Sequence, residues 1–266
     1  MNKFKSATDV LSLNTIITQL DGINFGDVIV LETVNSTNTY AKELAQNGAK
    51  HNTIVIANHQ TSGRGRLGRD FFSPAGTGIY MSIIMHPDGC TLDPTALTIA
   101  AGVAVCRAIE DICNRHPQIK WVNDIFLDGR KICGILAEAG TNSGTLDYII
   151  VGIGINVSTQ NFPAELSNIA GSLGENIDRS LIAGKVIAEF FNLQPFCGSG
   201  ELIKEYKSRS LVLGKTLFFT KDGKTHTGVA TDVNNEGNLI VTIENGKTEI
   251  LKSGEISLSS SKFTNV

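Results

Sequence analysis

The sequence predicts an α+β protein with a large main domain, residues 1–211, and a small β-barrel domain, residues 212–266. Two observations support this division. Before Gly214, runs of apolar and β-branched residues alternate with apolar stretches of helical length. After Gly214, β-rich runs succeed one another at short intervals, separated by turn signals. The length of 266 residues suits one large domain with a small second one.

The first predicted elements are strands on either side of a short helix. Residues 28–31 predict a short strand, and residues 53–57 and 79–85 predict buried ones because they are apolar and largely β-branched. Residues 36–38, Ser-Thr-Asn, are typical of a helix N-cap. We expect the helix that begins there to end near Gly48.

The middle of the chain has the clearest local signals. Asp93-Pro94 is a good N-cap and first-turn pair, and it predicts a helix to about Cys113. That helix is apolar on nearly all sides, so we expect it to be buried. Asp128-Gly129 lies between two apolar runs and predicts a tight hairpin. Residues 147–154 predict a further strand.

The last third predicts two helices and then the small barrel. The helices cover residues 179–192 and 201–208, with Pro195 between them. The turn signals of the barrel are Asp222-Gly223, residues 234–237 and Asn245-Gly246. They separate predicted strands at residues 216–220, 225–233, 239–244 and 248–251. We expect an antiparallel barrel of about five strands.

Composition and cysteine content indicate the class of protein. The net charge of −3 does not favour DNA or an anionic membrane as a partner. The five cysteines form no CxxC pair and predict free thiols in a reducing compartment. They are Cys90, Cys106, Cys113, Cys133 and Cys197. No apolar run approaches the ~20 residues that span a bilayer, and the N-terminal stretch makes a poor signal sequence. We therefore expect a cytoplasmic protein.

A loop rich in glycine and arginine is the first candidate for chemistry. Residues 63–68 match the pattern GxGxxG, but the residues after them make a poor helix start, which disfavours a dinucleotide site. Arg64, Arg66 and Arg69 instead form a cationic loop whose donors suit phosphate or carboxylate oxygens. A solvated basic loop and an RNA-binding loop are the alternatives.

A second polar cluster surrounds the predicted hairpin. Lys120, Asn123 and Asp124 precede it, and Lys131 lies on its return strand. If residues 120–124 are extended, Lys120 and Asp124 share one face. One carboxylate near two lysines suggests a site that handles anions, although an exposed salt-bridge cluster would look the same.

A third candidate is the end of the predicted strand at residues 147–154. Gly152 and Gly154 would let a ligand approach the backbone, and Asn156 could bind a ligand or a metal-bound phosphate. A strand bulge with a turn-forming asparagine is the alternative. The histidines show no metal-ligand spacing, so we predict no metal site built from protein ligands, and no HExxH or GxSxG motif is present.

Taken in order, these segments resemble the biotin–protein ligases. The matching pieces are Ser36-Thr-Asn38, Gln60, Gly63 to Arg69, Ser73-Pro74, Lys120 to Asp124, Arg130 to Leu136, Gly152 to Asn156 and Gly254-Glu255-Ile-Ser-Leu258. The chain departs from the family where Val122 replaces a common proline and Phe71 an often-found tryptophan. Residues 170–172 also lack the aromatic that some members place on adenine.

The resemblance implies a fold and an activity. The fold would be a mixed-sheet catalytic domain of the biotin/lipoate ligase type, followed by an SH3-like barrel. The enzyme would join biotin to ATP as biotinyl-5'-AMP with Mg²⁺, release pyrophosphate, and pass biotin to a lysine of a biotin carboxyl carrier protein. We expect the form without an N-terminal winged-helix repressor domain, as a monomer or homodimer.

The resemblance also implies residue roles. The catalytic residues would be Lys131, Arg66 and Asp124. The biotin site would be formed by Ser36, Thr37, Asn38, Gln60, Gly63, Arg64, Gly65, Arg66, Lys131 and Gly134. ATP and the adenylate would be bound by Arg66, Arg69, Phe71, Lys120, Asn123, Gly154 and Asn156. A lipoate or octanoate ligase and a non-enzymatic module that binds RNA or a protein tail remain alternatives.

Overall fold

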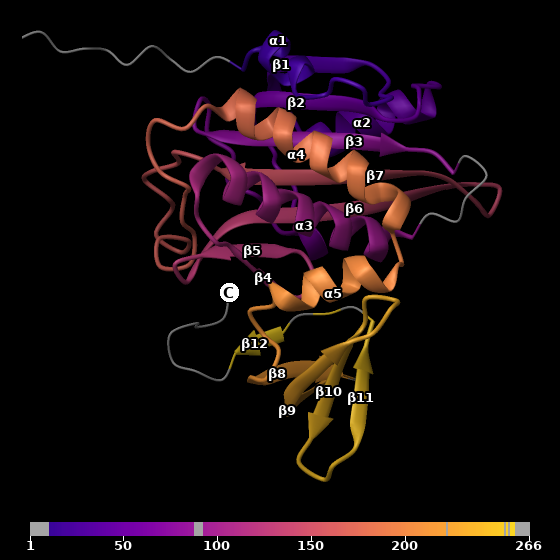
Figure 1. The fold of residues 1–266 in the computed structure, drawn as a ribbon, viewed down its shortest axis with the longest axis vertical. Helices are drawn as coiled ribbons and strands as arrows, with labels where there is room; N and C mark the ends of the chain where they lie inside the picture. Colours follow the sequence, from indigo (N-terminus) through magenta and orange to yellow (C-terminus); the bar gives the residue numbers. More distant parts are fainter. Residues whose placement is uncertain (1–10, 88–92, 222, 253, 255, 259–266) are drawn as a thin grey trace, which may run out of the picture.

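Seven strands form the main sheet of the computed structural model, which describes residues 11–87, 93–221, 223–252, 254 and 256–258 (Figure 1). In spatial order they are β1 (Val28–Val34), β2 (Thr53–Gln60), β3 (Gly78–Met85), β7 (Thr145–Asn156), β6 (Arg130–Asn142), β5 (Asp124–Leu127) and β4 (Gln118–Lys120). The first two strands are parallel, and the other neighbours are antiparallel. Cys90, Asp222 and Glu255, named above, lie outside the described residues.

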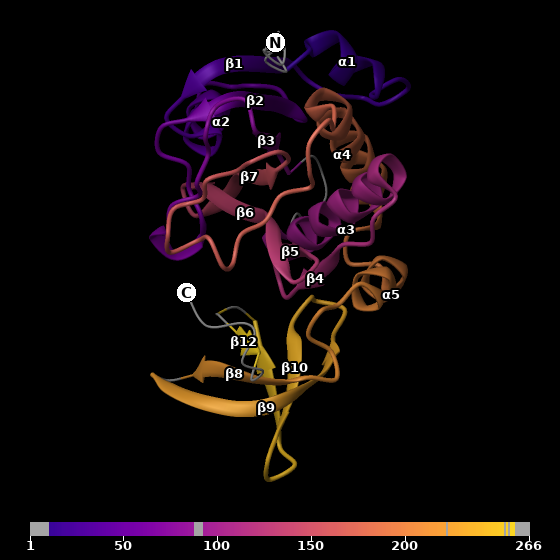
Figure 2. The same ribbon diagram turned by 90° about the vertical axis from the view of Figure 1, so that its left-hand side faces the viewer.

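Helices cover both faces of this sheet. The helices α3 (Pro94–Cys113) and α4 (Arg179–Leu193) lie on one face together with α1 (Leu13–Thr18), whereas α2 (Thr37–Gln46) lies on the other (Figure 2). Neighbouring strand residues therefore face different cores. Ile54 and Ile56 belong to the large core under α3, and Val55 belongs to the small core under α2.

Local signals set the bounds of α3 and of the central hairpin. Asp93 caps α3 by accepting a hydrogen bond from the backbone N–H of Ala96 at 2.8 Å. The helix is buried on most sides, as predicted. In the β5–β6 turn, Asp128 and Gly129 have φ values of 51° and 75°, which confirms the predicted tight turn.

Residues 120–124 are not one extended segment, so the condition under which Lys120 and Asp124 would share one face of a strand is not met. Residues 121–123 form a turn, so that β4 and β5 pair as a hairpin in which Lys120 lies directly opposite Asp124. Tertiary contacts hold this turn: the Trp121 indole Nε1 donates to the carbonyl of Gly237 at 2.9 Å, and the Tyr206 hydroxyl donates to the carbonyl of Val122 at 3.2 Å. The Lys120 and Asp124 side chains are therefore cross-strand neighbours on β4 and β5 and do not lie along one strand.

Ion pairs and hydrogen bonds between charged side chains connect α5 (Gly200–Ser208) to α3. Arg107 of α3 donates to both carboxylate oxygens of Glu205, at 3.0 and 2.6 Å. Arg209 reaches the same carboxylate at 2.9 Å and Glu110 at 2.5 Å. The hydrogen bonds from Arg107 lower the pKa of Glu205, burial opposes the shift, and Arg209 reinforces it.

We expect Glu205→Gln to destabilise the fold by about 1.5–3 kcal/mol at pH 7, the usual range for hydrogen bonds to a charged group. The folded-state pKa is depressed, so this contribution is full above about pH 4.3 and is lost as the pH falls through the folded pKa. Urea denaturation at pH 7 and pH 3.5 measures it. Glu236→Gln, at an exposed turn, is the control. An equal cost at both pH values would contradict the prediction.

The C-terminal segment forms a separate five-stranded antiparallel sheet. Its order is β11 (Thr248–Leu251), β10 (Leu239–Ile243), β9 (Lys224–Val233), β8 (Thr216–Lys221) and β12 (Ile256–Leu258). Within the described residues β11 and β12 are its edges, so the predicted strands are confirmed and the closed barrel is not found. The helices of the described residues include none with the length and apolarity needed to cross a bilayer.

Candidate functional site

A cavity of about 580 Å³ lies between the main sheet and the C-terminal sheet. Most predicted site residues line it: Ser36, Thr37, Asn38, Gln60, Arg64, Gly65, Arg66, Arg69, Phe71, Lys120, Asn123, Asp124, Lys131, Gly134 and Gly154. Among charged side chains, five basic ones face only two acidic ones, Asp70 and Asp124. The cavity therefore favours an anion although the whole chain carries −3. Its size is that of a small-molecule site.

The N-terminus of α2 forms one wall of the cavity through a buried hydrogen-bond chain. Gln60 Oε1 accepts from the backbone N–H of Thr37 at 2.8 Å and from its hydroxyl at 3.1 Å. Gln60 Nε2 donates to Ser73 Oγ at 2.9 Å. Ser82 Oγ lies 2.8 Å from Thr37 Oγ1. These bonds fix the first turn of the helix against β2 and β3.

Ser36 occupies the N-cap position of α2, but its side chain makes no capping hydrogen bond. A serine at this position usually accepts from a helix N–H. Ser36 is only 3% exposed and lines the cavity. The helix thus leaves this hydroxyl available to a molecule in the cavity.

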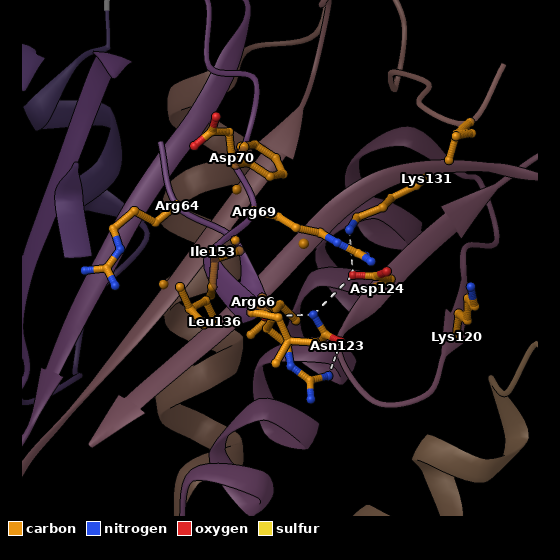
Figure 3. A pocket seen from close by; sticks show the side chains of 18 of the residues that line it. Arg64, Arg66, Arg69, Asp70, Lys120, Asn123, Asp124, Lys131, Leu136 and Ile153 are labelled. Atoms are coloured by element: carbon orange, nitrogen blue, oxygen red, sulfur yellow. Dashed lines mark hydrogen bonds and ion pairs between the residues drawn. The ribbon is translucent and has the colours of Figure 1, made fainter. Parts of the chain in front are cut away.

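On the opposite wall, side chains from three elements converge (Figure 3). The Lys131 ammonium lies 2.7 Å from Asp124 Oδ1. Asn123 Nδ2 donates to the same carboxylate oxygen at 3.2 Å and to the Ile135 carbonyl at 3.0 Å. Arg66 Nη1 donates to Asn123 Oδ1 at 2.8 Å. The half-buried Lys131 and Arg66 are thus held around one carboxylate and one amide, where an anion can meet both.

The glycine- and arginine-rich loop closes the cavity on one side. Its ends are joined by hydrogen bonds from the N–H of Gly65 to the carbonyl of Arg69 at 2.7 Å and from Phe71 to Gly63 at 2.9 Å. At its tip Leu67 has φ 56° and is 74% exposed. Arg64 turns away from Lys131 (Figure 3) and pairs with Glu138 at 3.0 Å. The three arginines therefore differ in orientation, which the sequence did not indicate.

Phe71 covers a pair of glycines on the cavity floor. Gly134 and Gly154 are direct cross-strand partners on β6 and β7. A Cβ on Gly154 would lie 2.6 Å from the Phe71 ring, and one on Gly134 would lie 3.4 Å from it. Gly152 leaves room for Asn38 in the same way. We expected these glycines to admit a ligand; in this structure Phe71 and Asn38 fill the space at Gly154 and Gly152, so any ligand must lie against those side chains.

Two predicted residues do not line the cavity, and several lining residues were not predicted. Gly63 lies behind the wall, where a Cβ would meet Phe71 O and Ser73 Oγ at 2.4 Å. Asn156 is buried at the end of β7, and its Oδ1 has no hydrogen-bond partner within the described residues. The unpredicted lining includes residues 166, 168 and 169 and, from the C-terminal sheet, Phe218, Phe219, Thr220, Thr225, Gly254, Ile256 and Ser257. Gly254, Ile256 and Ser257 belong to the last of the matching segments, but no local sequence signal marks any of these positions as part of the site.

Burial determines the direction of the pKa shift of two other titratable groups near the site. Burial raises the pKa of the Tyr80 phenol, whose hydroxyl donates to the Pro74 carbonyl at 2.8 Å. Burial also raises the pKa of the Cys133 thiol, which makes this cysteine a poor nucleophile. Among the described residues, no three His, Cys, Asp or Glu side chains gather as a metal site.

Sequence comparison assigns the chain to a known family. Residues 30–156 match the biotin/lipoate A/B protein ligase family, and residues 212–259 match the biotin protein ligase C-terminal domain. The bifunctional ligase/repressor BirA of Bacillus subtilis is 35% identical over 84% of this chain and 71% of its own length. The chain belongs to the biotin protein ligase family.

Other members of the family agree in sequence and in fold. The biotin–[acetyl-CoA-carboxylase] ligase of Mycobacterium tuberculosis is 29% identical over 88% of this chain and 90% of its own length. The biotin protein ligase of Aquifex aeolicus, solved with biotin and ATP, superimposes with a TM-score of 0.77 at 30% identity. That alignment covers 89% of this chain and all of the Aquifex chain. The mixed sheet and the separate C-terminal sheet are thus features of this biotin protein ligase family fold.

Proposed function

We propose that the cavity binds biotin and ATP together and that Lys131 and Arg66 stabilise the charge that develops as biotin is activated. As a member of the family, the chain is an ATP-dependent ligase that activates biotin and transfers it to a carrier protein. One observation carries the residue assignment: Lys131 and Arg66 converge on Asn123 and Asp124 in a cavity with an excess of basic groups.

In the first half-reaction a biotin carboxylate oxygen attacks the α-phosphorus of ATP. The bond to pyrophosphate breaks, and biotinyl-5'-AMP remains. Both reactants are anions, so the protein's task is to hold them together and to stabilise charge on phosphorus. Lys131 would contact the biotin carboxylate and later the mixed anhydride, while Arg66 would close over both. No protein nucleophile is needed.

In the second half-reaction the amine of a carrier lysine attacks the biotinyl carbonyl carbon, and AMP leaves. We propose that Asp124, held by Lys131 and Asn123, orients that amine or the phosphate region. Mg²⁺ would enter as Mg·ATP and neutralise phosphate charge. The Asp124 carboxylate is an oxygen donor of the kind that Mg²⁺ prefers, so the residues present fit this requirement.

The polar end of biotin would lie at the α2 wall. Ser36 has a hydroxyl available there, and Thr37 and Gln60 frame the pocket. Arg69, Phe71, Lys120 and Gly154 line the remaining part of the cavity, where we place the adenylate. Asn156 stays a prediction for the ATP site, because it is buried and does not line the cavity.

Other expectations also belong to this proposal. The acceptor would be a lysine of a biotin carboxyl carrier protein, and the enzyme would act in the cytosol as a monomer or homodimer. Free thiols at Cys106, Cys113, Cys133 and Cys197 support a reducing compartment. The match of residues 212–259 to the family's C-terminal domain supports an SH3-like arrangement of the C-terminal sheet.

Pyrophosphate release tests the function and separates it from the alternatives. The purified chain is given Mg·ATP with biotin, with lipoate or with no acid. Release that requires biotin is the expected result. Release with lipoate alone would contradict the biotin assignment and indicate a lipoate ligase. No release with either acid would favour the binding-module interpretation.

We further expect the arginine loop to order when biotin binds. Its tip is exposed and is held by few backbone hydrogen bonds, such as Gly65 to Arg69. Hydrogen exchange of residues 64–69 should slow at least about tenfold with biotin and not with ATP alone, because closure over biotin would complete the ATP site. Amides in the middle of α3 serve as the control. Equal protection with and without biotin would refute this.

A further inference from the structure

Glu138 on β6 connects two parts of the cavity wall without lining the cavity itself. Its Oε2 accepts a hydrogen bond from Asn38 Nδ2 at 2.8 Å. Its Oε1 lies 3.0 Å from Arg64 Nη2. One carboxylate thus holds the first turn of α2 and the beginning of the arginine loop. Glu138 belongs to none of the sequence motifs described above.

The Asn38 amide is engaged at both ends. Its Oδ1 lies 2.6 Å from Ser82 Oγ, opposite the bond that Nδ2 makes to Glu138. It also fills the space above Gly152, where a Cβ would lie 2.1 Å from Asn38 Oδ1. The polar atoms of Asn38 are therefore directed at the protein. These contacts give Asn38 a supporting role, and the biotin contact predicted at this position stays a prediction.

Burial indicates which of the two contacts of Glu138 matters more. The side chains of Arg64 and Glu138 are 49% and 35% exposed, and ion pairs so exposed contribute little because water screens them. Asn38 is 6% exposed. A buried amide donor that loses its partner pays its full desolvation cost. The hydrogen bond to Asn38 is therefore the dominant contact.

We propose that Glu138 is a positioning residue for biotin, acting through Asn38. By holding Asn38, it keeps the first turn of α2, with Ser36 and Thr37, fixed against β6 and β7. The ion pair with Arg64 adds a weaker anchor for the start of the loop. This inference rests on the proposed placement of biotin at the α2 wall. It predicts that Glu138 affects biotin binding and that, at saturating biotin, ATP binding and the chemical step stay unchanged.

Calorimetric titration with biotin alone tests the proposal without requiring catalysis. We expect Glu138→Ala to raise the Kd for biotin about tenfold, because Asn38 Nδ2 loses its closer acceptor and keeps only the Leu136 carbonyl, at 3.5 Å. Glu138→Gln retains an acceptor oxygen and loses only the exposed ion pair, so its Kd should stay within about threefold of the wild type. Asp27→Asn is the control, because it removes an exposed ion pair with Lys50 beside β1.

Steady-state kinetics with the same variants distinguishes a specific effect on biotin positioning from a general loss of folded enzyme. The KM for biotin should rise in Glu138→Ala, while kcat and the KM for ATP, both measured at saturating biotin, stay within about twofold. Ser82→Ala, which removes the hydrogen bonds to Asn38 Oδ1 and to Thr37 Oγ1 in the same turn of α2, should shift the biotin Kd in the same direction. It replaces Glu138→Ala if that variant does not fold.

Three results would overturn the proposal. They are an unchanged biotin Kd in Glu138→Ala, an equal loss in the Gln and Ala variants, or a parallel rise in both KM values. A wild-type chain that binds no biotin would instead overturn the proposed function. The wild-type titration therefore distinguishes the two failures.

Discussion

We expect Lys131→Ala to lower biotin-dependent pyrophosphate release by about 10²–10³-fold, the usual cost of removing one donor that stabilises transition-state charge. In the structure the Lys131 ammonium lies 2.7 Å from Asp124 and faces the cavity from β6. The substitution removes the cation and also leaves the Asp124 carboxylate without this partner beside the incoming anions. Both effects raise the activation barrier for the reaction between the biotin carboxylate and the α-phosphate of ATP, which are both negatively charged.

The measurement is single-turnover pyrophosphate release at saturating biotin and Mg·ATP. Lys204→Ala, on the exposed side of α5, removes a lysine outside the cavity lining and should retain full activity. Asp124→Asn tests the second effect, since it removes the carboxylate that pairs with Lys131. A Lys131→Ala rate within about tenfold of the wild type would show that the cavity places the biotin carboxylate elsewhere.

Arg66→Ala is the second variant with a large expected effect, a loss of about 10²-fold in the same assay. Arg66 begins the exposed tip of the loop, and its Nη1 contacts Asn123 Oδ1 at 2.8 Å. Closure of the loop would bring its planar guanidinium over the carboxylate and the α-phosphate. A fork of N–H donors can bind two oxygens at once, which a methyl group cannot replace.

Arg66→Lys distinguishes charge from geometry. Lysine keeps the charge but lacks the planar fork, so it should recover only part of the loss. Lys247→Ala, in the exposed turn between β10 and β11, is the control for a change of surface charge. If Arg66→Ala also accelerates the release of biotinyl-5'-AMP into solution, the loop retains the intermediate. Full activity in Arg66→Ala would remove Arg66 from the mechanism.

Local sequence signals predicted most elements of the fold because they act over a few residues. Asp93-Pro94 starts α3 because the Asp93 side chain accepts a hydrogen bond from the backbone N–H of Ala96, only three positions further along the chain. Asp128-Gly129 forms its turn because both residues adopt positive φ. The order of the motifs predicted the family, and with it most of the residues that meet in the cavity. None of these inferences required knowledge of which strands pair.

Distant contacts decided what local patterns left open. An extended conformation of residues 120–124 was only one possibility; in the structure Trp121 bonds to Gly237 and Val122 to Tyr206, and residues 121–123 form a turn. Glu138 and Ser82 look like ordinary strand residues, and only the fold shows that Asn38 lies between them. The contribution of Phe218 and its neighbours to the cavity depends on how two sheets meet.

The amino-acid sequence alone thus predicted most of the elements and their order, because capping, turn formation and hydrophobic periodicity are short-range effects. The order of the matching motifs indicated the family and, with it, the residue types of the site. Tertiary packing selected which cations converge on Asp124, which polar side chains are consumed by internal hydrogen bonds, and which glycines are already covered by Phe71 and Asn38. These properties depend on strand order and on distances between residues far apart in the chain, which no local pattern encodes.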